Sequence, residues 1–127
     1  MSYKYAVDTE HRILSIAFNG DVHGEDLLEA VVVMVQLDSQ YPDYRHVWDG
    51  LEIRMLDVDY KDLLKLVAYI KEEMLPVMKN CPGTAVFVRR HVDYLLIKTI
   101  HLMVGAPQPF VVLRDPEALK AWIEQAA

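Results

Sequence analysis

The sequence lacks a second cysteine and any long run of apolar residues. A single thiol, Cys81, excludes an internal disulfide and favours a reducing compartment such as the cytoplasm. The longest uncharged apolar run covers 30–35 and is far too short to cross a bilayer. The first residues also lack the apolar core of a signal peptide. We therefore expect a cytoplasmic protein.

Basic residues are in deficit. Lys and Arg number 13 against 19 Asp and Glu, which gives a net charge of −6. Such a chain repels nucleic acid, so we expect no nucleic-acid partner. The five histidines show neither HxH nor HExxH spacing, so we expect no metal site and no cofactor. They are His11, His23, His46, His91 and His101.

Catalytic motifs are missing as well. No nucleophile and base stand at a recognisable spacing, and Cys81 has no base partner nearby in the sequence. We expect a protein that is not an enzyme and has no catalytic residues. The apolar fraction is 53%, slightly above the usual range of about 45–50%. This surplus is typical of a ligand cavity, a partner surface or an oligomer interface, and it favours a homodimer.

What the sequence does contain is alternating strand and helix patterns. Alternation predicts strands at 3–7 and 13–18, with Asn19 and Gly20 as the turn after them. Helical spacing predicts a helix over 25–37, although three successive valines there favour a strand. Further strands are expected at 45–49, 84–88 and 110–113, and further helices at 60–75, 92–103 and from Asp115 onward.

The resulting order is β-β-α-β-α-β-α-β-α. Strands that alternate with helices imply a mostly parallel sheet, here with one antiparallel strand from the N-terminal hairpin. The fold class is therefore α/β, a mixed sheet with four helices, and 1–127 form one domain.

The region 45–78 is the centre of this arrangement: a strand, a loop over 50–56, and a long amphipathic helix. Leu63, Val67, Ile70 and Met74 share one face of that helix. Asp57 or Asp59 is placed to cap its first turn. Pro76 ends or kinks it.

The order of elements and several short motifs resemble the SpoIIAA-like family, which has the STAS-domain fold of bacterial anti-sigma factor antagonists. The matching motifs are the strand exit at 18–20, the helix start at 25–27, Tyr44-Arg45 leading to Trp48-Asp49, and the closing segment 117–123. The resemblance covers essentially the whole chain.

The antagonists carry a phosphorylated serine at a helix start, eight to nine residues after a strand-ending aspartate. Here Val58 occupies that position, so no such phosphoswitch is available. An interaction edge of the antagonist type would comprise Asp49, Asp57, Val58 and Asp59. Capping of the helix, without any binding role, is the favoured interpretation of Asp57 and Asp59.

Two groups of residues are candidates for ligand binding. The first surrounds the central helix and is rich in Met and Tyr, which adapt to apolar ligands: Met55, Leu56, Tyr60, Tyr69, Met74 and Met78. Ordinary core packing is the alternative for this group. The second is Arg89 and Arg90, at a strand-to-helix junction suited to an anion. Pairing with Asp49, Asp57, Asp59 or Asp93 is the alternative for them.

The resemblance implies a non-enzymatic module that binds a small apolar or amphipathic ligand and makes peripheral contact with a membrane. The alternative is a protein-interaction regulator of the antagonist type that lacks the phosphorylatable serine.

Overall fold

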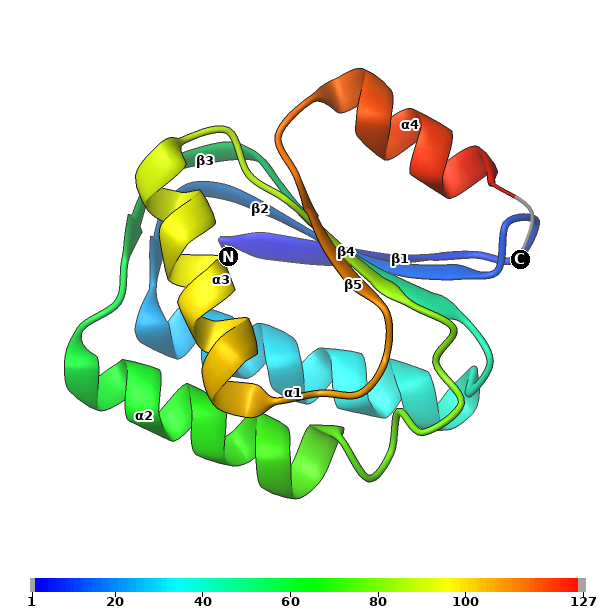
Figure 1. Cartoon of the computed structure of the whole chain (residues 1–127), viewed down its shortest axis with the longest axis horizontal. Coiled ribbons are helices and arrows are strands. Elements are labelled where there is room, and N and C mark those ends of the chain that lie inside the picture. Colours follow the sequence, from blue (N-terminus) through cyan, green and yellow to red (C-terminus); the bar gives the residue numbers. More distant parts are fainter. Residues whose placement is uncertain (1, 126–127) are drawn as a thin grey trace.

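The computed structural model describes residues 2–125, which contain five strands and four helices in the predicted order (Figure 1). The strands are β1 (Tyr3–Asp8), β2 (Ile13–His23), β3 (Arg45–Asp57), β4 (Thr84–Phe87) and β5 (Phe110–Leu113). The helices are α1 (Gly24–Gln40), α2 (Tyr60–Tyr69) with its π-helical continuation η1 (Ile70–Met74), α3 (His91–Val104) and α4 (Pro116–Glu124).

The strands lie in the sheet in the order in which they occur in the chain, β1-β2-β3-β4-β5. β1 is antiparallel to β2, and every other pair is parallel. Each parallel crossover therefore moves one position in the same direction, and right-handed crossovers of that kind place their helices on one face. Figure 1 shows α1, α2 and α3 on one face of the sheet and α4 alone on the other.

Two sequence predictions about the centre of the sheet were wrong. Asn19 and Gly20 do not turn the chain out of β2, and 50–56 is not a loop. Instead, β2 continues to His23 and pairs in parallel with the second half of β3. The register shifts twice, and each time β3 carries one extra residue, so these positions bend the strands rather than end them.

The helical predictions were largely confirmed. The three valines of α1 lie within the helix, because Val31 and Met34 at helical spacing face the core. Asp115 caps α4 by accepting a hydrogen bond from the Glu117 N–H at 3.1 Å, with Pro116 at the first helical position. The central helix differs, because its last turn is a π-helix.

The sheet separates two cores. The larger one lies between the sheet and α1, α2 and α3, and includes Leu14, Ile16, Val22, Met34, Leu66 and Ile100. The smaller one lies under α4 and comprises Ile13, Val47, Ala85, Phe87 and Leu119, with Trp122 and Ile123 packed against them. Adjacent residues of one strand thus serve different cores, as the alternation of β-strand side chains requires.

Candidate ligand cavity

An apolar cavity of about 140 Å³ lies within the larger core. Its wall is formed by the sheet and by residues of α1, α2 with η1, and α3. The residues of this wall include Trp48, Leu66, Ile70, Met74, Val86 and Ile100. A void of about 150 Å³ with such a lining stays dry in other proteins and accepts a guest as large as benzene. The cavity therefore has the size and chemistry to hold a small apolar molecule.

Gly50 allows β3 and β4 to approach closely at one end of the cavity. A Cβ atom at this position would lie 2.6 Å from the carbonyl oxygen of Phe87 and 3.0 Å from Cδ1 of Ile53. Any side chain there would force the strands apart. The glycine therefore fixes the backbone of β3 as part of the cavity wall.

The π-helical segment supplies part of the opposite wall. The N–H of Leu75 donates to the carbonyl of Ile70 at 2.9 Å, a bond that spans five residues instead of four. Ile70, Met74 and Leu75 all line the cavity. Wider helical turns of this kind occur frequently at functional sites, and here the wider turn borders the hollow part of the core.

The predicted residues around the central helix are only partly brought together. Leu56, Met74 and Met78 line the cavity. Met55 and Tyr60 are instead exposed, at 41% and 72%, and Tyr69 packs against the core without lining the cavity. Ile97, Ile100 and Val104 of α3 also line the cavity, and they were not among the residues predicted from the sequence.

Arg89 and Arg90 lie outside the cavity wall, at the carboxyl end of β4. Arg90 makes a two-pronged contact with Asp93, with Nε and Nη2 each 3.0 Å from a carboxylate oxygen. This hydrogen bonding raises the pKa of the Arg90 guanidinium. Arg89 is exposed, and its carbonyl accepts a hydrogen bond from Arg114 at 3.2 Å. The two arginines thus have different environments: Arg90 is paired with a carboxylate, while Arg89 is exposed.

The four residues of the predicted interaction edge do not form one surface. Asp59 caps α2 by accepting a hydrogen bond from the Asp62 N–H at 2.8 Å. Oδ2 of Asp57 lies 3.7 Å from Nδ1 of His23. Val58 between them is half-buried. Asp49 is separated from them by the second half of β3, and it borders an open groove beside α4.

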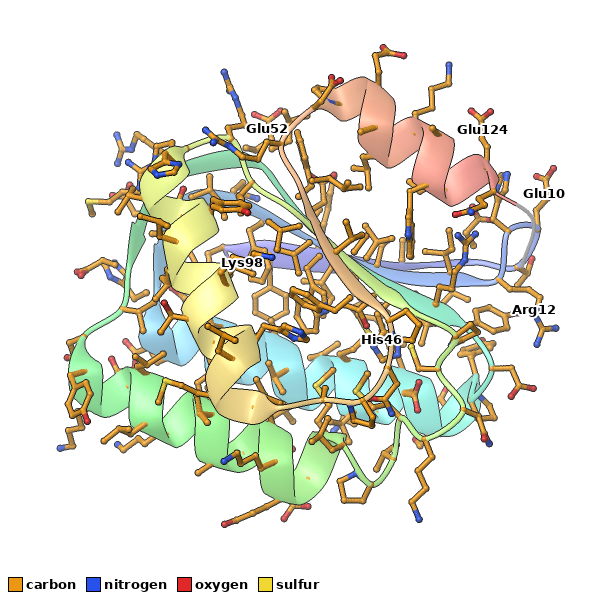
Figure 2. All side chains as sticks on the ribbon, viewed as in Figure 1. Glu10, Arg12, His46, Glu52, Lys98 and Glu124 are labelled. Carbon is orange, nitrogen blue, oxygen red and sulfur yellow. The ribbon has the colours of Figure 1, made fainter. Side chains whose placement is uncertain are left out.

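A buried polar cluster lies close to the cavity, and sequence spacing gave no sign of it. Nε2 of His46 lies 2.8 Å from Oδ1 of Asp38, and both side chains are fully buried (Figure 2). Burial, the largest influence, lowers the pKa of His46, but attraction to the hydrogen-bonded Asp38 and to the nearby Cys81 outweighs it and raises the pKa to about 9. His46 and Asp38 therefore form an ion pair at neutral pH.

Cys81 has no base partner nearby in the sequence, but the fold brings His46 beside it. Burial raises the pKa of the Cys81 thiol, yet the neighbouring His46 more than offsets this, and the pKa is lowered overall. Sγ of Cys81 also lies 3.3 Å from the carbonyl oxygen of Gly83. The two residues are 35 positions apart in the sequence, and they meet because β3 and β4 are neighbours in the sheet.

Within residues 2–125, no group of three or more His, Cys, Asp or Glu side chains is placed to hold a metal ion. The same part of the chain has no helix that is long and apolar enough to cross a membrane.

No protein-family model and no curated protein matches this sequence. Among solved structures, the chain is similar to an uncharacterized protein of the DUF3478 family from Shewanella loihica PV-4, which is described as having a SpoIIAA-like fold. The identity is 14%, the TM-score is 0.57, and the match covers 95% of this chain and 91% of the other. The predicted SpoIIAA-like fold is thereby confirmed.

Proposed function

We propose that this SpoIIAA-like chain is a non-enzymatic module that binds a small apolar or amphipathic molecule in the cavity between the sheet, α2–η1 and α3. The observation that carries the proposal is the cavity itself, about 140 Å³ of hollow core with an almost entirely apolar wall. Protein cores are normally packed to the density of organic crystals. A hollow of this size is a cost that a ligand would offset.

The destabilisation caused by this cavity can be approximated from its volume. Residual cavities destabilise a protein by roughly 24 cal/mol per Å³, so this one corresponds to about 3 kcal/mol relative to a filled core. A bound guest would regain much of that through dispersion contacts with the wall. Binding should therefore stabilise the folded chain, with the logarithm of the ligand concentration once that concentration exceeds the Kd.

The outer faces of α2 and α3 support a membrane-surface role for the same module. Val92, Leu95 and Leu102 of α3 are 61%, 51% and 81% exposed. Leu64 of α2 is 42% exposed. Exposed apolar side chains on adjacent helices are typical of surfaces that contact partners or lipid. Arg89 precedes α3 and would face anionic headgroups.

Ligand binding is tested first by native mass spectrometry on protein purified without delipidation, beside a denatured control. Extra mass that disappears on denaturation identifies a bound molecule. The site is then tested by NMR titration with toluene, which is small enough for the cavity. We expect saturable shifts at the residues of the wall.

Two variants on α3 locate the toluene site. Ile97→Phe places a larger, aromatic side chain at a half-buried position of the wall. This side chain should take up space in the cavity, so toluene affinity should fall at least tenfold. Leu102→Phe makes a similar change on the exposed side of the same helix and should leave the affinity unchanged. Equal affinity in both variants, or no toluene binding to the unmodified chain, would refute the cavity as a ligand site.

The membrane contact has a separate test. Cosedimentation with vesicles of mixed neutral and anionic phospholipid should decrease when Leu95 and Leu102 are both changed to Ser. Replacing Arg89 by Ala should reduce binding to anionic vesicles more than to neutral ones. If the unmodified chain stays in the supernatant with both kinds of vesicle, the module does not act at a membrane surface.

A further inference from the structure

Two polar residues stand among the apolar residues that line the cavity. Thr84 and Gln108 both line it, and Oγ1 of Thr84 and Oε1 of Gln108 are buried without a hydrogen-bond partner among the described residues. A buried polar atom without a partner costs roughly 1–3 kcal/mol. Two such atoms on the wall of one cavity indicate where a ligand would form hydrogen bonds.

Thr84 faces the cavity because of its place in β4. Ala85 and Phe87 belong to the core under α4, so Thr84 and Val86 point to the opposite side, where both line the cavity. The residue is 7% exposed. The Thr84 hydroxyl lies beside the Cys81 sulfur and helps to lower the pKa of that thiol. Sulfur accepts hydrogen bonds only weakly, so the hydroxyl remains available to a stronger partner.

The orientation of the Gln108 amide is fixed chemically. Its Nε2 donates to the carbonyl oxygen of Met78 at 3.1 Å. The reverse orientation would set two acceptors against each other, so the oxygen must be the free atom. Oε1 of Gln108 is therefore a pure acceptor at the cavity wall, and it matches a donor on the ligand.

The two side chains come from adjoining backbone. The N–H of Thr84 donates to the carbonyl of Pro109 at 2.9 Å, and Thr84 is paired in register with Phe110. Gln108 directly precedes Pro109. Thr84 and Gln108 thus mark one end of the cavity, the amino end of β4, whereas Arg89 follows the carboxyl end of the same strand.

We infer that the ligand is a neutral apolar molecule with a hydroxyl group, and that Thr84 and Gln108 hold this hydroxyl at the amino end of β4. The inference rests on the proposed function and specifies the ligand class of that cavity. The ligand hydroxyl donates to Oε1 of Gln108 and accepts from the Thr84 hydroxyl. A carboxylate does not fit, because it has no proton for Oε1 of Gln108 and would face that atom's lone pairs.

Phenol and toluene form a matched pair of probes, since they differ only by a hydroxyl in place of a methyl group. NMR titration gives the ratio of the toluene Kd to the phenol Kd for each variant. Thr84→Val keeps the shape and removes the hydroxyl, so this ratio should fall about fivefold, the equivalent of one net hydrogen bond of about 1 kcal/mol. Thr84→Ser keeps the hydroxyl and should preserve the ratio. Val86→Ala, on the same side of β4, should weaken both probes alike.

A thermal unfolding measurement separates binding from a purely structural role. Thr84→Val removes an unpartnered buried hydroxyl, so its unfolding midpoint without probe should be higher than that of the unmodified chain. A lower midpoint would mean that the hydroxyl is satisfied within the fold, and it would overturn the inference.

The titrations distinguish failure of this inference from failure of the proposed function. If toluene and phenol both bind and Thr84→Val leaves their ratio unchanged, the cavity takes ligands but the hydroxyl assignment is wrong. If neither probe binds the unmodified chain, the cavity is not a ligand site and both proposals fall.

Discussion

The two faces of the sheet are packed in opposite ways. Three helices cover one face and leave a hollow of about 140 Å³ within the core, while α4 alone covers the other and leaves an open groove lined by Phe87 and Leu119. The unfilled space thus lies inside the core under three helices and opens to solvent beside the single helix. On the α4 face, a single buried arginine compensates for the small contact area.

That arginine is Arg45 of β3, which is 7% exposed. Its Nη1 donates to the carbonyl of Trp122 at 2.7 Å, and its Nη2 donates to the carbonyls of Ile123 and Gln125 at 2.9 and 3.3 Å. The guanidinium also lies over the Trp122 ring, 4.5 Å from its centroid. The Trp122 carbonyl also accepts a hydrogen bond from the Gln125 N–H at 3.4 Å, so Arg45 adds to the capping of the last turn and fastens it to the sheet.

The largest effect in this comparison should come from Arg45→Ala. It removes the capping bonds and the ring contact, and hydrogen bonds to charged groups contribute about 1.5–3 kcal/mol each. Because these bonds share one donor group, we expect a loss of about 4 kcal/mol in the free energy of unfolding, measured by urea denaturation. Hydrogen exchange should show α4 opening while α1 stays protected.

Arg54→Ala provides the control for that change. Arg54 also makes a two-pronged bond, to Asp21 at 2.8 and 2.6 Å, but its side chain is 78% exposed. Solvent screens such a pair, so the loss should be much smaller. Equal losses in the two variants would mean that Arg45 does not fasten α4.

A smaller effect is expected from pH on the cavity face. The pKa of His46 is about 9 in the folded chain and about 6.5 in an unfolded one. Since the folded value is the higher, its stabilising contribution is complete below pH 6.5 and is lost as pH rises through 9. The His46 contribution alone would lower the free energy of unfolding by about 3 kcal/mol across that window. The lowered pKa of the Cys81 thiol offsets part of this, so urea titrations at several pH values should show a smaller net fall.

Asp38→Asn should flatten this pH profile. Without the carboxylate, burial dominates and His46 stays neutral in the folded chain across the window. An unmodified chain whose stability is constant from pH 6.5 to 9 would contradict the ion pair. An Asp38→Asn variant whose free energy of unfolding falls between pH 6.5 and 9 as much as that of the unmodified chain would contradict the ion pair as well.

The smallest effects compare the faces at adjacent residues of β4. Ala85 is fully buried in the core under α4, so Ala85→Val should overpack it and cost about 1–3 kcal/mol. Val86 lines the cavity, so Val86→Leu should be neutral or stabilise by up to about 1 kcal/mol. Thermal unfolding of both variants checks the difference, and a cost at Val86 as large as at Ala85 would mean that the hollow is not usable space.

Local patterns predicted the order of elements and missed how far two strands run. The segment after Gly50 does alternate, with Leu51 and Ile53 against Glu52 and Arg54, and this signal was sufficient for a strand. Gly20 was assigned to a turn because glycine often marks one. Its positive φ of 69° is accommodated within β2 instead.

The cavity was harder to predict than the fold. The spacing of apolar residues predicts which side of a helix faces the core, but it does not show whether their side chains fill the space there. A hollow core and a filled core therefore have the same sequence pattern. Leu56, Met74 and Met78 were named because they cluster around one helix. Thr84 and Gln108 were missed, because their partnerless atoms are defined only by the packing of segments distant in the sequence.

The strand order of the sheet bears on how the chain is made. Each of β2 to β5 pairs with the strand synthesised immediately before it. On the ribosome, every new strand thus finds its neighbour already present, and no early edge must wait for a segment from the far end of the chain. The exception is Arg45, whose carbonyl partners are translated 77 or more residues later. Closure of α4 over the sheet therefore has to wait until residue 125 has been translated.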